Sequence, residues 1–189
     1  MQPMELRSTR DYVAEQLRKE ILSKRLAPGT MIQQESISAQ MGVSRTPVRE
    51  AFQLLEAEGL LERLPTRHIR ILGIDDEQMR QILQITCAME KMALDMISRQ
   101  EDFSFRFSND VDAGVRLHVH LVEQLHNPPI VSVLCRLLKS YVRFAAPKHE
   151  EAFARLQSCN RVLNEALDSR AWKRAADAID RYYHTYLEE

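Results

Sequence analysis

Apolar side chains recur at helical spacing in the stretch SRTPVREAFQLLEAEGL, residues 44–60. They fall at i, i+3, i+4 and i+7, which predicts an amphipathic helix with one buried stripe formed by Val48, Ala51, Phe52 and Leu55. Ser44 is placed to cap the start of this helix, Pro47 is tolerated in its first turn, and Gly59 is placed to end it.

The opposite face of the predicted helix is polar and cationic. Arg45 and Arg49 lie one turn apart, so both guanidinium groups point the same way, with Thr46 and Gln53 beside them. A short helix with an apolar back and a cationic, hydrogen-bonding front near its N-terminus fits a DNA major groove. An amphipathic surface helix with two solvated arginines is the alternative that this stretch alone leaves open.

The flanking segments favour the DNA-binding interpretation. Residues 9–26 have the pattern of a first helix, which Pro28-Gly29 stops, and residues 33–41 have the pattern of a shorter second one. Gly42 and Val43 form the tight turn into the helix that follows Ser44, which completes a helix-turn-helix. Two short apolar runs, 61–64 and 69–72, predict a β-hairpin with its loop at 65–68. Three helices and a β-hairpin make a winged helix.

Residues 10–72 resemble the DNA-binding domain of the GntR superfamily of bacterial transcription regulators. The resemblance lies in the runs LRKEILSKRLAPGT and GVSRTPVREAFQLLEAEGLLERLPTR. It implies that the helix front contacts bases and phosphates in the major groove and that the wing tip reaches the minor groove. The expected DNA-binding residues are Ser44, Arg45, Thr46, Arg49, Gln53, Thr66, Arg67 and His68.

Two positions depart from the pattern of that family. Many relatives carry a basic residue where this chain has Glu35, so one phosphate contact is expected to be missing. The wing usually has Gly where this chain has His68, and a glycine is freer to adopt positive φ. His68 is either a side chain that enters a narrow minor groove or a solvated loop residue.

The second half of the chain is helical throughout, with segments expected at 76–98, 109–126, 128–145, 148–168 and 171–187. The runs LHVHLVEQLHNPPI and NRVLNEALDSRAWKRAADAID resemble the FCD ligand-sensing domain of the FadR-like branch, although the chain is short between residues 98 and 112. The fold expected is mainly α: a winged helix in residues 1–73, followed by a reduced antiparallel helical bundle in 74–189. Four methionines are expected to fill the core of the bundle: Met79, Met89, Met92 and Met96.

Composition narrows the class of protein. The chain is 44% hydrophobic and 28% charged with a net charge of −1, and residues 1–73 carry 11 Lys and Arg against 9 Asp and Glu. DNA binding must therefore come from a local patch of charge. Three cysteines without a CxxC spacing indicate reduced thiols in a cytoplasmic protein. No signal peptide and no apolar run long enough for a membrane span are recognisable.

The histidines invite a metal-binding interpretation, which the spacing weakens. His118 and His120 are two residues apart on one predicted helix, so at most one faces the core, where a satisfied hydrogen bond is commoner than a ligand role. The resemblance places the four metal-ligand positions of many FCD domains on Gly114, His118, Asn160 and Tyr182. Only His118 is a strong ligand among these. We therefore expect no cofactor and no bound metal, and an effector pocket near Thr86, His118, Asn160 and Tyr182.

The sequence predicts a DNA-binding transcription regulator, with repression as the commoner family pattern. Two copies on a pseudo-palindromic operator would multiply specificity, which favours a homodimer. A small metabolite bound in the bundle would modulate operator affinity. The alternative is a bundle used only for dimerisation, without an effector. An enzyme is disfavoured, because the chain has no nucleophile elbow, P-loop, dinucleotide or HExxH motif.

Overall fold

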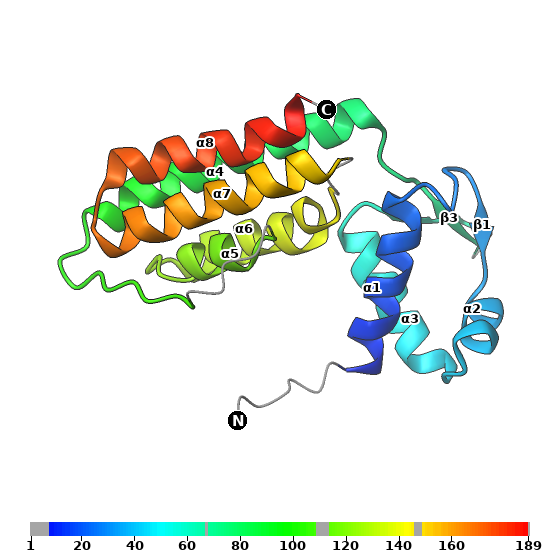
Figure 1. Ribbon diagram of the computed structural model, residues 1–189. Coiled ribbons are helices and arrows are strands. Elements are labelled where there is room, and N and C mark those ends of the chain that lie inside the picture. Colours follow the sequence, from blue (N-terminus) through cyan, green and yellow to red (C-terminus); the bar gives the residue numbers. More distant parts are fainter. Residues whose placement is uncertain (1–7, 67, 109–113, 146–148, 189) are drawn as a thin grey trace. The chain divides into compact units, whose positions relative to one another are not determined.

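The computed structural model describes residues 8–66, 68–108, 114–145 and 149–188. The chain divides into two compact units between Asp75 and Asp76, close to the expected division after residue 73. The first unit combines helices with a small sheet and the second is helical (Figure 1). The expected mainly α fold is confirmed. No helix in the described residues is long and apolar enough to cross a membrane.

The N-terminal unit is a winged helix. Its helices are α1 (Thr9–Leu22), α2 (Gln34–Met41) and α3 (Arg45–Ala57), and its strands are β1 (Met31–Ile32), β2 (Leu61–Arg63) and β3 (Ile69–Ile71). The antiparallel sheet has the order β1-β3-β2, with Ile69 opposite both Ile32 and Arg63. The sequence predicted only the β2–β3 hairpin, because a strand of two residues is too short to show alternation.

Packing between α1 and α3 forms the core of this unit (Figure 1). The predicted apolar stripe of α3 is fully buried, and it faces the buried side chains of α1. Gly42 adopts φ 64°, which makes the tight turn between α2 and α3, and Gly59 adopts φ 76° just after α3 ends. Both glycines serve where a side chain would be strained.

A buried ion pair joins α1 to the end of α3. The Arg18 guanidinium donates to both carboxylate oxygens of Glu58, with N–O distances of 2.8 and 2.7 Å. Both side chains are almost entirely buried. This pair was not predicted, because two residues forty positions apart show no periodic signal in the sequence.

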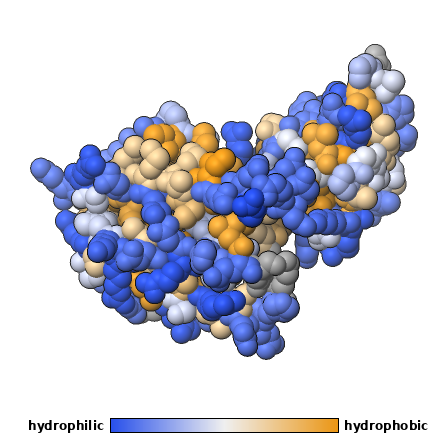
Figure 2. Space-filling view, turned by 90° about the horizontal axis from the view of Figure 1, so that it is seen from above, coloured by the Kyte–Doolittle hydropathy of each residue, from blue (hydrophilic) through white to orange (hydrophobic). Residues whose placement is uncertain are grey.

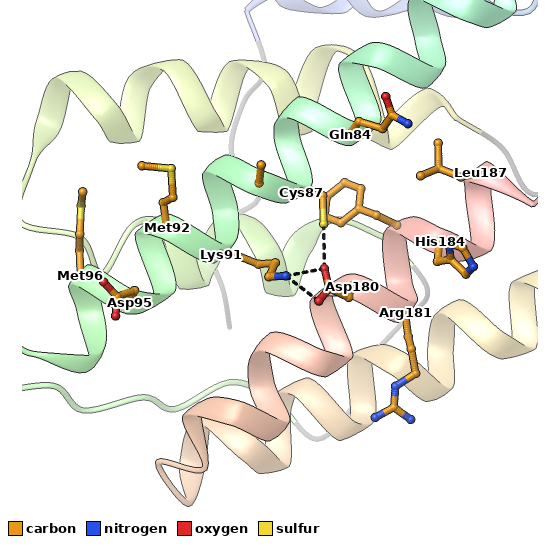
Figure 3. A pocket seen from close by; sticks show the side chains of 12 residues that line it. Gln84, Cys87, Lys91, Met92, Asp95, Met96, Asp180, Arg181, His184 and Leu187 are labelled. Atoms are coloured by element: carbon orange, nitrogen blue, oxygen red, sulfur yellow. Dashed lines mark hydrogen bonds and ion pairs between the residues drawn. The ribbon is translucent and has the colours of Figure 1, made fainter.

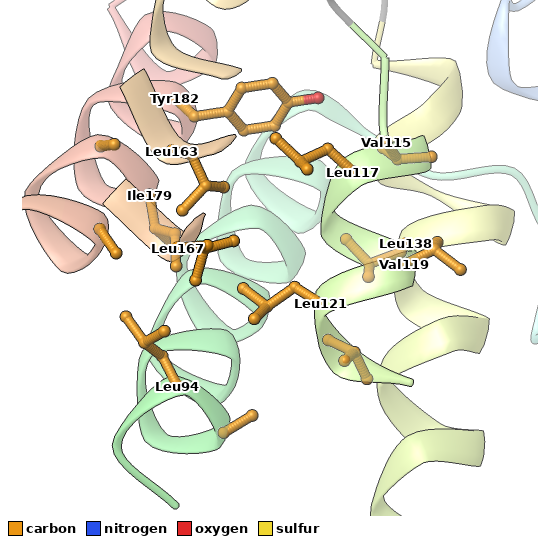
Figure 4. Packing of buried hydrophobic residues seen from close by; sticks show 14 of the residues in the cluster. Leu94, Val115, Leu117, Val119, Leu121, Leu138, Leu163, Leu167, Ile179 and Tyr182 are labelled. Atoms are coloured by element: carbon orange, nitrogen blue, oxygen red, sulfur yellow. The ribbon is translucent and has the colours of Figure 1, made fainter. Parts of the chain in front are cut away.

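The C-terminal unit is a helical bundle. It contains α4 (Asp76–Ser98), α5 (Arg116–Val122), α6 (Pro128–Ser140), a 3₁₀ turn at Val142–Phe144, α7 (Glu150–Asp168) and α8 (Trp172–Leu187). Helix α8 packs against both α7 and α4. Apolar side chains of α4, α5, α7 and α8 interdigitate between them, as Leu94, Leu121, Leu167 and Ile179 show (Figure 4).

Two predicted helices of the bundle are shorter than expected. The helix expected at 109–126 is observed from Arg116 to Val122, and residues 109–113 of that prediction lie outside the described residues. The helix expected at 128–145 ends at Ser140 and continues as the 3₁₀ turn. Its start is as predicted, because the Asn127 side chain caps it by accepting from the amide of Ile130 at 3.3 Å.

Residues 103–107 have no regular secondary structure and belong to the connection after α4. Phe103 and Phe105 alternate with exposed residues and are buried. Phe103 meets Trp172 edge-on at a ring distance of 5.0 Å, and Arg170 donates to the Phe103 carbonyl at 2.6 Å. Alternate aromatic side chains thus attach this connection to the bundle.

The prediction that four methionines fill the bundle core is wrong for two of them. Met79 and Met89 pack against the core, whereas Met92 is 61% exposed and Met96 is 42% exposed. The stripe that faces the core passes instead through Leu83, Thr86, Glu90, Ala93, Leu94 and Ile97. Two polar residues therefore replace apolar ones on the inner side of α4.

The Arg18–Glu58 pair yields a stability prediction. Glu58→Ala leaves a buried guanidinium without its carboxylate, and we expect a loss of about 3–5 kcal/mol in the stability of the winged helix. Urea unfolding followed by circular dichroism and by hydrogen exchange of the α1 amides measures it. The combined replacement Arg18→Met with Glu58→Leu should recover most of the loss. Glu20→Ala, which breaks the exposed pair with Arg25, is the control and should leave unfolding unchanged.

Candidate nucleic-acid interface and interior polar cluster

The front of α3 presents a compact set of hydrogen-bonding side chains. Arg45, Thr46, Arg49 and Gln53 are all exposed, and Ser44 is exposed at the N-cap position. Their orientation follows from the complete burial of the helix back. The structure thus brings the five helix residues of the predicted DNA-binding set to one surface.

The wing adds a second polar surface. Thr66 and His68 are exposed in the loop between β2 and β3, and the His68 Nδ1 lies 3.1 Å from the Thr66 hydroxyl. Arg67, the remaining member of the predicted set, lies outside the described residues. A polar cavity of about 560 Å³ separates Thr66 and His68 from the start of α2.

Glu35 lines the same cavity as the wing residues and contacts the first residue of α3. Its carboxylate is 3.2 Å from the Arg45 guanidinium, and both side chains remain exposed. Glu35, which replaces the basic residue of many relatives, therefore lies next to an arginine that is expected to contact bases. A carboxylate at this place repels phosphates while it orients the arginine beside it.

A second polar group, the interior cluster, lies inside the helical bundle and consists of Glu90, His118, Asn160 and Tyr183. His118 Nδ1 lies 2.6 Å from Glu90 Oε1, and His118 Nε2 lies 2.9 Å from Asn160 Oδ1. The Tyr183 hydroxyl donates to Glu90 Oε2 at 2.8 Å. All four residues have no exposed surface.

The hydrogen bonds orient the side chains of the interior cluster relative to one another. The Asn160 amide nitrogen donates to the Gly114 carbonyl at 2.9 Å, so its oxygen faces His118 and accepts from Nε2. Burial raises the pKa of the Tyr183 hydroxyl well above its usual range, and the Glu90 carboxylate adds to this, so Tyr183 stays a donor.

Two of the four predicted effector-pocket residues belong to the interior cluster, and a third contacts it. His118 and Asn160 are hydrogen-bonded members, and the Tyr182 ring packs on the His118 ring at 4.1 Å. Thr86 is buried on the same helix as Glu90, where its hydroxyl donates to the Ile82 carbonyl at 2.7 Å. Glu90 and Tyr183 were not predicted as members of this site, although an acidic residue on the apolar side of α4 was a usable signal.

Comparison with known proteins supports the DNA-binding surface. Residues 9–71 match the family model of bacterial regulatory proteins, gntR family. A probable D-xylose utilization operon transcriptional repressor of Paenarthrobacter nicotinovorans is 38% identical over 91 residues, and the transcriptional repressor RspR of Escherichia coli is 37% identical over 89 residues. These matches cover 46% and 45% of this chain. Residues 9–71 are therefore similar to the DNA-binding domain of gntR-type regulators.

The matches span only about two fifths of the length of these two repressors, 40% and 39% respectively. The fold extends further than this sequence similarity. The solved structure of E. coli McbR/YncC aligns over 96% of both chains with a TM-score of 0.68 at 15% identity. The two-domain fold of the whole chain is therefore shared with another protein, whereas the sequence likeness is strongest in the DNA-binding domain.

The four metal-ligand positions that the resemblance to FCD domains implied do not form a ligand set here. Gly114 contributes a carbonyl that accepts from Asn160, and both ring nitrogens of His118 are engaged by Glu90 and Asn160. Within the described part of the chain, three or more His, Cys, Asp or Glu side chains nowhere gather as a metal site would require. The donor set does not fit a zinc-type ion, which favours several nitrogen, sulfur or carboxylate ligands.

The interior cluster yields a prediction for the bundle. His118→Ala leaves Glu90 buried without its ring partner, and we expect a loss of about 3–5 kcal/mol in stability. Trp172, the single tryptophan of the chain, reports unfolding of this unit by fluorescence. His120→Ala is the control, because His120 is only half-buried, with a hydrogen bond to the Arg106 carbonyl at 3.1 Å and ring contacts with Phe105 and Phe107. It should cost about 1 kcal/mol. Equal unfolding of both variants would contradict a structural role for the cluster.

Proposed function

We propose that this protein is a GntR-family, sequence-specific DNA-binding transcription regulator whose α3 front enters the major groove. One observation carries the proposal: Arg45, Thr46, Arg49 and Gln53 are exposed on a helix whose back is completely buried. Arginines so placed can make bidentate bonds to guanine, and the hydroxyl and amide can reach other base edges. Both related proteins described above are named repressors, which supports repression as the direction of regulation.

The wing supplies the minor-groove contacts in this proposal. Thr66 and His68 are exposed at its tip, and Arg67 between them remains part of the predicted set. Glu35 limits attraction to phosphates because its carboxylate pairs with Arg45. Discrimination between operator and other DNA then depends more on base contacts than on charge.

The DNA-binding prediction concerns Arg45 and Arg49. Changing either residue to Ala should weaken binding to an operator isolated by selection by about 1–3 kcal/mol. Fluorescence anisotropy with labelled duplex, repeated over a series of salt concentrations, measures the affinity and its salt dependence. Glu35→Gln should strengthen binding to unrelated DNA, because it removes a negative charge that faces phosphates.

Arg155→Ala is a matched control for these arginine variants, since Arg155 is an exposed arginine of α7 in the helical unit. It should bind the operator as tightly as the unmodified chain. An Arg45→Ala protein that also retains full affinity would show that α3 does not read the groove.

The proposed regulator acts as a homodimer. One winged helix reads only a few base pairs, and two related by a two-fold axis on a pseudo-palindrome multiply specificity. Size-exclusion chromatography with light scattering should therefore give about twice the chain mass of 22.0 kDa. A chain that stays at its own mass at micromolar concentration would contradict the palindromic-operator model.

A small-molecule effector is the remaining part of the proposal. We place it at the interior cluster, because polar side chains inside an apolar bundle are the natural contacts for a polar metabolite. The alternative, a bundle that serves only to dimerise the chain, is favoured by the complete pairing of His118 with Glu90 and Asn160. A thermal-shift screen of small organic acids, amines and sugars separates the two, because a specific ligand raises the unfolding temperature.

The proposed place of action is the cytoplasm, where the DNA lies.

A further inference from the structure

Helix α4 carries an exposed apolar stripe on the side away from the bundle core. Ile85, Ala88, Met92 and Met96 follow one another at i, i+3, i+7 and i+11, and all four are exposed. Steps of three and four residues place these side chains on one side of the helix, which is the spacing by which one helix packs along another. A helix that contacted only its own bundle would carry polar residues there.

The stripe borders a groove between α4 and α8, here called the α4–α8 groove, of about 840 Å³ (Figure 3). Met92 and Met96 project from α4 at one side of it, and His184 and Leu187 come from α8 at the other. Hydrophobic side chains gather between charged ones on the face seen in Figure 2, which looks down on α4 and α8. The groove is thus an apolar surface with a polar border.

Charges of both signs line the groove in equal number. Lys91 donates to both oxygens of Asp180 at 2.8 and 2.6 Å, and Asp95 and Arg181 add one further charge of each sign. The Cys87 thiol donates to Asp180 at 3.5 Å. Burial, with the adjacent Asp180 carboxylate, raises the pKa of Cys87 to about 12, so it lines the groove as a neutral thiol.

We propose that a second copy of this chain occupies the α4–α8 groove, so that the face of α4 and α8 is the two-fold dimer interface. The inference rests on the proposed homodimer and names its surface. An isologous interface brings one patch against itself, which requires a patch without excess charge of either sign. The balanced charges of Lys91, Asp95, Asp180 and Arg181 meet this requirement, whereas a nucleic acid or a strongly charged protein would need a surface of one sign.

The side chains of the stripe are suited to helix–helix contact between the two copies. Ala88 is small enough to let a partner helix approach closely, and Ile85 and Met92 on either side of it supply bulk. Methionine adapts its shape to an opposing surface. Burial of this stripe removes from water the large apolar side chains that α4 otherwise exposes.

The test uses the full chain and one charged substitution. Met92→Glu places a carboxylate in the middle of the stripe, where each copy would bring its own charge to the interface. Light scattering after size-exclusion chromatography should then fall from about twice the chain mass to the chain mass. Circular dichroism should be unchanged, since Met92 is 61% exposed in the single chain.

Two controls match Met92 in exposure and apolar character but lie on other helices. Val133→Glu on α6 and Phe153→Glu on α7 replace side chains that are 47% and 52% exposed. Both variants should keep the dimer mass. Met92→Cys should be joined to its counterpart by a short bismaleimide, whereas Phe153→Cys should give no more cross-linked dimer than the unmodified chain with its three cysteines.

The outcomes separate this inference from the proposed function. If the unmodified chain is a dimer and Met92→Glu is also a dimer, the interface lies elsewhere and the groove assignment is overturned, while the homodimer stands. If Val133→Glu or Phe153→Glu dissociates and Met92→Glu does not, the interface lies on α6 or α7. An unmodified chain that is monomeric overturns both the homodimer and the interface.

Discussion

The packing of α3 on α1 is the constraint on which the proposed DNA-binding surface depends. Burial of Val48, Phe52 and Leu55 against α1 leaves only one side of α3 for Arg45 and Arg49. The Arg18–Glu58 pair joins the same two helices through a bidentate contact. A rotation of α3 that changed which side chains lie on its outer side would expose this apolar stripe, so the hydrophobic effect holds the proposed DNA-binding surface in place. Recognition and folding are therefore coupled in the winged helix.

Local periodicity allowed most of the fold to be predicted. The spacing of apolar residues located α1, α3 and α4, and the Asn127-Pro128 pair located the start of α6 within one residue. The two-residue strand β1 was not predicted, because it exists only through its pairing with β3. The ends of α5 and α6 also depend on tertiary packing rather than on signals in the local sequence.

The two candidate sites also differ in how far the sequence could predict them. The front of α3 could be read from sequence, because the side chains of one short helix have fixed relative directions. The interior cluster could be read only in part, since Glu90, His118 and Tyr183 come from three helices whose pairing no single segment determines. Met92 and Met96 were assigned to the core from their apolar character alone, which does not determine the side of α4 that faces inward. The observed inner side of α4 carries the polar residues Thr86 and Glu90 instead.

The contact between Glu35 and Arg45 has a consequence for how quickly such a protein finds its operator. A regulator must leave many unrelated DNA positions before it reaches the correct one, and its dwell time at each is set by phosphate attraction. A carboxylate beside the reading arginine weakens that attraction and holds the guanidinium while no guanine is present. In the proposed complex, bidentate bonds to a guanine would draw Arg45 from this partner. The pair would shorten each unproductive stop and so favour rapid sampling of the chromosome over tight non-specific adhesion.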